Sequence, residues 1–355
     1  MENNMQKIDA LCEKALTSGD LSKEELLILL SCPDDQSDII FKTADIVRKK
    51  EVGDAVHLRG LIEFSNYCKK NCEYCGIRGK NKNIERYRLT KEQIIATAKN
   101  AETLGYRSVV MQSGEDPYFT ADMLSDIVSS IKKETDLAIT LSAGEFSYED
   151  YKKMKQAGAD RYLIRFETSS EELYKKLHPD SDFRARIECL HMLKELGYQV
   201  GTGFMVGLPG ETPEIMADNL LLLQKLDVDM AGIGPFLPNE DTNLAGEAGG
   251  TLVNSLKAVA LTRLLLRNAH IPATTAMGSL DPKGREKALQ AGANVVMPNV
   301  TPEEFREMYQ LYPNKICLRD DPSHCRRCIT GKIQALGRNV SSEHGHSLKI
   351  ETKQP

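Results

Sequence analysis

Three cysteines that could bind a metal cluster, Cys68, Cys72 and Cys75, lie within eight residues in the string Tyr67-Cys-Lys-Lys-Asn-Cys-Glu-Tyr-Cys-Gly76. A structural zinc site normally takes four protein ligands, and no histidine follows this group closely. A four-iron cluster held by three thiolates instead keeps one iron open for a further ligand. The run follows residues 57–64, a strand-like segment, so it occupies the loop after a strand. This pattern favours an iron-sulfur cluster over a zinc knuckle or a redox pair with a spare thiol.

A second group of three cysteines, Cys317, Cys325 and Cys328, lies near the C-terminal end with the spacing C-x7-C-x2-C. We expect an accessory iron-sulfur cluster there. Two alternatives are a zinc site that takes His324 as its fourth ligand and a loop of unused thiols. The remaining cysteines, Cys12, Cys32 and Cys189, stand alone on helical patterns and are expected to be buried structural thiols.

Length and composition limit the classes of function. The 355 residues, 41% of them hydrophobic, suffice for two ordinary domains or one large α/β barrel. A net charge of -5 argues against a nucleic-acid surface. The N-terminal residues lack an apolar targeting segment, and no stretch is long and apolar enough to span a membrane. We therefore expect a cytoplasmic protein in a reducing compartment, with small molecules or proteins as partners.

The pattern of apolar residues predicts a helical segment over residues 1–50 and then strands that alternate with helices. Eight strands are expected at residues 57–64, 108–112, 138–142, 161–167, 199–206, 230–235, 273–277 and 294–298. Eight evenly spaced βα units predict a (β/α)8 barrel of the TIM type over residues 51–312. Residues 313–340 are then a C-terminal cluster-binding extension, and residues 341–355 are expected to be a disordered tail.

Polar residues recur at positions that would face the interior of this barrel. The segment 161–167 places Arg165 and Glu167 on one face, where two charges are costly unless they neutralise each other or bind a zwitterionic or anionic ligand. The neighbouring segments end in further polar residues, Thr140, Ser142, Thr274 and Thr275. These favour a ligand site at the C-terminal ends of the strands. His178 and His191 are predicted to be ordinary surface or helix histidines.

The first cysteine motif, with an aromatic residue before its last cysteine, resembles that of radical S-adenosylmethionine (SAM) enzymes. Over residues 50–335 the chain resembles more closely the HydE family of [FeFe]-hydrogenase maturases. The strings that carry this resemblance include Arg165-Phe-Glu-Thr168, Met205-Val-Gly-Leu-Pro-Gly-Glu-Thr212, Gly232-Ile-Gly-Pro-Phe-Leu-Pro238 and Ile271-Pro-Ala-Thr-Thr-Ala-Met-Gly278. The last two are the more specific, because the first cysteine motif is common to the whole superfamily.

The resemblance implies that Cys68, Cys72 and Cys75 bind a catalytic [4Fe-4S] cluster, whose electron splits SAM into methionine and a 5'-deoxyadenosyl radical. It implies that SAM is positioned by Tyr74, Gln112, Ser142, Glu167 and Arg186. Residues 113–115 resemble a Gly-Gly-Glu element that holds the methionine amino group, with Ser113 in place of the first glycine, which adds Gly114 and Glu115 as contacts. Met205 is expected either to face the adenosine or to fill the core.

The same resemblance implies a small carboxylate-bearing substrate, derived from cysteine and bound to iron, in assembly of the hydrogenase H-cluster. Its binding residues would be Thr140, Arg165, Thr274 and Thr275, with Met230 and Tyr309 lining the cavity. Implied partners are a low-potential electron donor such as ferredoxin or flavodoxin and, transiently, other maturases. The C-terminal cluster, [2Fe-2S] or [4Fe-4S], matches one found in only some relatives.

Other functions stay open at this level. Methylornithine synthase and biotin synthase resemble the same barrel and first motif, although biotin synthase needs cluster ligands on its strands and the expected strands here contain no cysteine. A non-catalytic iron-sulfur scaffold or carrier is an alternative of another class. Formation of 5'-deoxyadenosine separates it from the enzymes.

Overall fold

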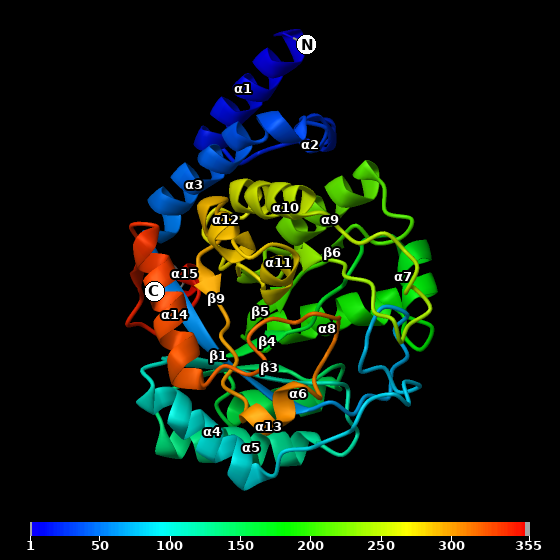
Figure 1. Ribbon diagram of the computed structural model, residues 1–355, viewed down its shortest axis with the longest axis vertical. Coiled ribbons are helices and arrows are strands. Elements are labelled where there is room, and N and C mark those ends of the chain that lie inside the picture. The colour runs from blue at the N-terminus through cyan, green and yellow to red at the C-terminus, as the bar shows by residue number, and fades with distance from the viewer. Residues whose placement is uncertain (1, 352–355) are drawn as a thin grey trace.

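Parallel strands follow one another around the centre of the molecule in the computed structural model, which describes residues 2–351 (Figure 1). The strands are β1 (Ala55–Ser65), β2 (Ser108–Ser113), β3 (Ala138–Ser142), β4 (Arg161–Leu163), β5 (Gln199–Thr202), β6 (Met205–Val206), β7 (Met230–Ala231), β8 (Gly234–Pro235), β9 (Val295–Val296) and β10 (Asn339–Val340). The sheet runs in the order β10-β1-β2-β3-β4-β5-β7, with β9 also paired to β1, and β6 pairs with β8. All of these pairings are parallel, as βα units require.

Short bridges close the ring between β7 and β9. Met230 pairs with His270, and Pro272 pairs with Val295. The backbone NH of Ala231 donates to the carbonyl of His270 at 2.9 Å. The chain at residues 270–272 thus takes the place of the seventh strand, and the expected (β/α)8 barrel is confirmed.

The expected seventh strand at residues 273–277 is nevertheless wrong. Thr275 begins a helix, α11 (Thr275–Leu280), so the extended stretch ends earlier than the β-branched residues suggested. Thr274 is the residue before this helix and has extended backbone angles. Because two threonines favour strands as single residues, their pattern alone could not reveal the helix that tertiary packing imposes.

Helices cover the barrel and extend it at both ends of the chain. They are α1 (Glu2–Thr17), α2 (Lys23–Leu30), α3 (Asp38–Val52), α4 (Lys91–Thr103), α5 (Ala121–Glu134), α6 (Tyr148–Gln156), α7 (Glu171–Leu177), α8 (Phe183–Glu195), α9 (Pro213–Leu226), α10 (Leu252–Leu265), α11, α12 (Gly284–Gln290), α13 (Glu303–Arg306), α14 (Pro322–Ala335) and α15 (Leu348–Glu351), with a short 3-10 helix at Asp34–Gln36. Local sequence fixes several starts: Ser22 and Thr90 each form a capping box, and the Thr212 hydroxyl accepts a hydrogen bond from the NH of Ile215.

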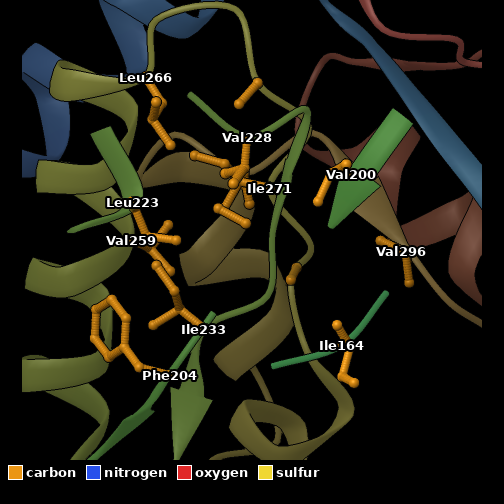
Figure 2. Packing of buried hydrophobic residues seen from close by; sticks show 14 of the residues in the cluster. Ile164, Val200, Phe204, Leu223, Val228, Ile233, Val259, Leu266, Ile271 and Val296 are labelled. Carbon is orange, nitrogen blue, oxygen red and sulfur yellow. The ribbon is translucent and has the colours of Figure 1, made fainter. Parts of the chain in front are cut away.

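One continuous apolar core joins the barrel to its surrounding helices. Figure 2 shows Val228 and Ile233, from the chain around β7, packed near Leu223 of α9 and Val259 of α10. The N-terminal helices α1–α3 belong to this same core, through residues such as Ile8. They lie together beyond α10 at one end of the molecule (Figure 1). No helix among residues 2–351 has the length and apolar character needed to cross a bilayer.

The C-terminal residues are packed against the barrel, so the expectation of a disordered tail is wrong for residues 341–351. The Arg161 guanidinium donates to the carbonyls of His344 and Gly345, both at 2.8 Å. The Ser347 NH donates to the side chain of Gln199 at 2.8 Å. Arg161 and Gln199 begin β4 and β5, so the segment 344–347 closes the N-terminal end of the barrel. The rest of the expected tail, residues 352–355, lies outside the described residues.

Candidate active site

The first cysteine loop lies at the opposite, C-terminal end of the strands, between β1 and α4. It is fastened to the loop after β2, because the NH of Lys69 donates to the carbonyl of Glu115 at 2.9 Å. The NH of Glu115 lies 3.3 Å from the sulfur of Cys68. A Cβ on Gly114 would lie 2.2 Å from the carbonyl oxygen of Tyr67, so only glycine permits this approach. The expected Ser-Gly-Glu element therefore adjoins the cysteine loop.

Arg86 holds the cysteine loop in its fold, and sequence analysis did not single it out. Its guanidinium donates to the carbonyls of Asn66, Ile77, Arg78 and Asn81, which lie on both sides of the three cysteines. A planar guanidinium with five donors suits such a gathering of carbonyls. Its position eleven residues beyond the last cysteine does not report which carbonyls it contacts, so only the fold reveals this role.

The donor chemistry of the loop fits an iron-sulfur cluster. The three thiols are free and half-buried. Burial, reinforced by the charge of Cys68, raises the pKa of the Cys72 thiol to about 12, and burial likewise raises the pKa values of Cys68 and Cys75. Thiolates here therefore require a cationic centre, which cluster irons supply. Among the described residues, no three His, Cys, Asp or Glu side chains converge on a single ion, whereas the thiolates of a four-iron cluster bind separate irons.

Tyr74, between the second and third cysteines, contacts a histidine that the sequence had not connected with the site. Its hydroxyl lies 2.9 Å from Nε2 of His178. His178 is 2% exposed and stacks on the ring of Tyr174, with centroids 4.1 Å apart. The prediction that His178 is an ordinary surface or helix histidine is therefore wrong. A buried imidazole needs polar partners. The sequence reveals neither that His178 is buried nor that its partner is Tyr74, 104 residues away.

A network of charges surrounds the expected SAM residues. Arg186 Nε lies 2.7 Å from a carboxylate oxygen of Glu145, and its Nη1 donates to the carbonyl of Arg165 at 2.7 Å. Lys70 lies 3.2 Å from Glu145 and 3.6 Å from Glu115. The NH of Glu145 donates to Glu115 at 2.6 Å. This network joins the cysteine loop to the ends of the third and fourth strand units, and it adds Glu145 and Lys70 to the expected set.

Glu167 occupies a strained backbone position at the end of the fourth strand unit. Its φ is 65°, in the left-handed region that costs a non-glycine residue on the order of 1–3 kcal/mol. Its backbone is held there by hydrogen bonds with Gly203 and Met205. Burial raises the pKa of its carboxyl, and the charges of Arg165 and Arg186 oppose that shift. Strain of this kind is typical of functional sites. Here the backbone conformation sets the direction in which the Glu167 side chain leaves the chain.

Arg165 and Glu167 lie together as the alternation predicted, with Nη2 and Oε2 2.9 Å apart. Neither atom has a hydrogen bond of good geometry to any described residue, although both are buried. Two threonine hydroxyls of the predicted substrate set, Thr140 Oγ1 and Thr274 Oγ1, are also buried without a described partner. Buried polar groups are normally paired. The interior of the barrel thus presents several unused donors and acceptors, as a site for a polar ligand requires.

The remaining residues of the predicted SAM and substrate sites have the following positions. Gln112 Nε2 donates to the hydroxyl of Tyr309 at 3.2 Å, and Gln112 is paired in register with Ser142. Met230 is buried, with its sulfur against the guanidinium of Arg59. Met205 packs with Leu208 and Phe236 in a small apolar cluster that Tyr74 borders, which is compatible with either of its expected roles. Thr275 is half-buried at the start of α11.

The C-terminal cysteines are only partly gathered. Cys317 and Cys325 are hydrogen-bonded to each other through their thiols, and this contact lowers the pKa of Cys317 to about 6. Cys325 is buried on α14, while Cys328, one turn later, is exposed. His324, the possible fourth zinc ligand, is exposed on the same helix. Asp320 also neighbours Cys317 and was not expected from the spacing.

Comparison with known proteins identifies the family. Residues 62–262 match the Radical SAM superfamily model. The chain is 52% identical over 314 residues to the [FeFe] hydrogenase maturase subunit HydE of Thermotoga maritima, covering 88% of this chain and 90% of that relative. It is 32% identical to 3-methylornithine synthase of Methanosarcina acetivorans, covering 82% and 83%. The crystal structure of methylornithine synthase (PylB) superposes with a TM-score of 0.83 at 28% identity, covering 96% of this chain and 99% of that one.

These matches agree with the geometry of the site. The superfamily match spans the cysteine loop, the charged network and most of the strands that carry the buried polar atoms. The match to HydE extends over most of both chains, which excludes a short shared motif as its cause. The protein therefore belongs to the radical SAM superfamily and, within it, to the HydE family.

Proposed function

We propose that the protein is a radical SAM enzyme that acts on a small carboxylate-bearing, cysteine-derived and iron-bound substrate in assembly of the [FeFe]-hydrogenase H-cluster. A [4Fe-4S] cluster bound by Cys68, Cys72 and Cys75 would supply the electron that cleaves SAM into methionine and a 5'-deoxyadenosyl radical. The observation that carries this proposal is that buried hydroxyls inside the barrel, those of Thr140 and Thr274, have no hydrogen-bond partner among residues 2–351 and lie below a loop of three free cysteines.

The charged network supports the proposed roles in binding SAM. Tyr74 lies within the cysteine loop and interacts with Glu167, and Arg186 donates a hydrogen bond to the backbone carbonyl of Arg165. Two further residues of the proposed SAM site, Gln112 and Ser142, lie at the ends of β2 and β3. Gly114 and Glu115 lie beside Cys68. Carboxylate side chains and backbone groups suit the amino group of an amino acid such as the methionine part of SAM, and guanidinium side chains suit its carboxylate.

Arg165, Thr140, Thr274 and Thr275 would hold the substrate carboxylate. The guanidinium offers a charge-assisted contact, and the threonine hydroxyls can donate to the same anion. Met230 and Tyr309 would line the same cavity. Thr140, Met230 and Tyr309 are buried, and their burial would help to exclude bulk water from a radical reaction.

The wider setting follows from the same proposal. We expect a cytoplasmic protein that receives electrons from a ferredoxin or flavodoxin and contacts other hydrogenase maturases transiently. Cys317, Cys325 and Cys328 would bind an accessory iron-sulfur cluster. Electron delivery and support of the fold are the two roles that we propose for it.

The test is anaerobic formation of 5'-deoxyadenosine from SAM by reconstituted protein and dithionite. If the wild-type protein forms no 5'-deoxyadenosine, the proposed enzyme function fails and the non-catalytic scaffold or carrier function replaces it. Complementation of a hydrogenase-maturation deletion then tests the biological role: Cys72→Ala is expected to abolish hydrogenase activity, and Cys325→Ala to retain it. Full activity of Cys72→Ala would contradict the mechanism.

The similarity to 3-methylornithine synthase favours that activity as the second candidate. Both reactions require a pocket for an amino acid inside a radical SAM barrel. Incubation with L-lysine separates them, because only the second activity yields methylornithine. Methylornithine formation together with failed complementation would replace the proposed substrate.

A further inference from the structure

A buried lysine lies behind the wall of the proposed cavity. The Lys315 ammonium lies 2.5 Å from Glu63 Oε1 and donates to the carbonyl of Tyr309 at 3.1 Å. The other carboxylate oxygen of Glu63 accepts from the side chain of Asn299 at 2.7 Å. Lys315 is 9% exposed and Glu63 1% exposed. Removing one partner of such a pair leaves an uncompensated buried charge, so each partner depends on the other.

The segment that carries Lys315, residues 308–315, lies across the cysteine loop. The NH of Gly76, directly after Cys75, donates to the carbonyl of Leu311 at 2.9 Å. The side chain of Asn66 donates to the carbonyl of Met308 at 2.7 Å. A Cβ on Gly76 would come within 2.2 Å of the carbonyl oxygen of Gln310. We call residues 308–315 the strap, because it is bound to the cysteine loop at one end and to β1 through Lys315 at the other.

Tyr309 connects the strap with the SAM residues. Its side chain is 1% exposed, and its hydroxyl accepts a hydrogen bond from Gln112. The Lys315 ammonium also lies 5.2 Å from the centre of the Tyr309 ring. A shift of the Tyr309 backbone would therefore move both the ring in the cavity and the partner of Gln112.

We propose that Lys315 is a positioning residue for the active site, which holds Tyr309 and the strap in place through its ion pair with Glu63. The proposal rests on the proposed function, since Tyr309 and Gln112 matter only if SAM and substrate bind beside them. Lys315 itself touches neither. It acts by keeping the Glu63 carboxylate neutralised and the Tyr309 carbonyl bonded.

The surroundings of Glu63 give this role a distinctive pH dependence. The titratable groups near its carboxylate are Lys315, Tyr87, Tyr309 and Tyr312. Burial raises the pKa values of all three tyrosines, so they stay neutral in ordinary buffers. Without Lys315, the buried Glu63 carboxylate would keep Asn299 as a partner but lose its counter-charge, and burial disfavours the charged form of such a group. Its ionisation at higher pH would then place an uncompensated charge beside the strap.

The experiment compares wild-type protein with Lys315→Met, Lys315→Arg and the double variant Lys315→Met/Glu63→Gln. Equilibrium binding of SAM to the reconstituted, oxidised protein is measured from about pH 6 to 8.5, and each variant's Kd is divided by the wild-type Kd at the same pH. For Lys315→Met we expect this ratio to rise about tenfold with pH as Glu63 ionises and displaces the strap. Lys315→Arg keeps the charge and should stay near one. The double variant should bind SAM several-fold more weakly at every pH, without the pH step.

Lys257→Met is the matched control. Lys257 is also a buried lysine that donates to a backbone carbonyl, that of Cys32, and pairs with one carboxylate, Asp34. It lies on α10, so its loss should lower stability without changing the pH dependence of SAM binding. A pH-independent ratio for Lys315→Met, or the same pH step in the control, would overturn the proposal.

Two further outcomes are separable. If Lys315→Met does not fold, the double variant decides, because it buries no charge: unchanged SAM affinity there would overturn the proposal. If the wild-type protein binds no SAM and forms no 5'-deoxyadenosine, the proposed function has failed rather than the role of Lys315.

Discussion

The Tyr74 hydroxyl donates a hydrogen bond to Nε2 of His178, and the direction follows from the other ring nitrogen. Nδ1 of His178 lies 3.1 Å from the carbonyl oxygen of Tyr174, which can only accept. Nδ1 therefore carries the proton and Nε2 is the acceptor. Burial lowers the pKa of His178 to about 3, with the charge of Arg186 adding to the effect, so the imidazole stays neutral.

His178→Ala is expected to destabilise the protein and weaken SAM binding. The variant leaves the Tyr74 hydroxyl without its acceptor, which costs about 1–3 kcal/mol, and the cavity adds to that loss. Denaturant unfolding and SAM affinity measure the two effects. The double variant Tyr74→Phe/His178→Leu, which buries no unpaired polar group, should recover part of the stability. Equal stability of His178→Ala and wild-type protein would contradict the assignment.

Thr140→Val is expected to stabilise the fold while impairing maturation. The Thr140 hydroxyl is buried without a described partner, and valine has nearly the same shape, so unfolding should cost about 1 kcal/mol more. Loss of the substrate contact should lower hydrogenase activity in complementation. Thr262→Val is the control, since the Thr262 hydroxyl on α10 is likewise buried and unpartnered but lies outside the lumen. A Thr140→Val variant with full maturation activity would remove this residue from the substrate site.

Truncation after Val340 is expected to destabilise the protein by about 3 kcal/mol or more, because it removes carbonyl acceptors from two buried guanidinium groups. Arg161 loses the carbonyls of His344 and Gly345, and Arg59 loses that of Gly345. Gly345→Ala should act in the same direction, since its φ is 64° and a Cβ would lie 2.7 Å from Nδ1 of His57. A truncated protein with an unchanged unfolding midpoint would show that the segment is dispensable.

Stability is expected to fall as the pH drops from about 7.5 to 5.5. Burial lowers the folded-state pKa values of four histidines, to about 4 for His57 and His346, to about 3 for His178, and well down for His270. The unfolded chain therefore binds more protons below about pH 6.5, and each group removes up to about 1.4 kcal/mol per pH unit. Glu211 opposes this, because burial raises its pKa to about 7. Urea midpoints at the two pH values test the sign; a higher midpoint at the lower pH would contradict it.

Sequence patterns predicted most of the barrel, because long alternating units carry strong signals. The range of β3 agrees with the expectation at both ends. The expected strands at residues 161–167, 199–206 and 230–235 are shorter or interrupted in the structure. The larger errors fall at residues 273–277 and 341–351, where packing against distant segments decides the conformation. Neither a short polar tail nor two adjacent threonines reveals such contacts.

The site was predicted unevenly for the same reason. The spacing of Cys68, Cys72 and Cys75 indicated a cluster site. The alternation of polar and apolar residues predicted that Arg165 lies beside Glu167. The partners that fix the site, among them Arg86, Glu145, His178 and Lys315, lie far away in sequence from the groups they hold or in patterns without distinctive spacing. Their roles depend on burial and geometry, which single residues in a sequence do not report.

The packed segment at residues 344–347 has a kinetic consequence. It covers the N-terminal end of the barrel, where Arg161 and Gln199 bind it. The cysteine loop lies at the other end, so if SAM binds there as proposed, it lies over the C-terminal end of the strands and the proposed substrate residues. The substrate must then enter before SAM, and the product can leave only after the SAM fragments. Such a compulsory order would appear as substrate that is trapped, and exchanges slowly, once SAM is bound.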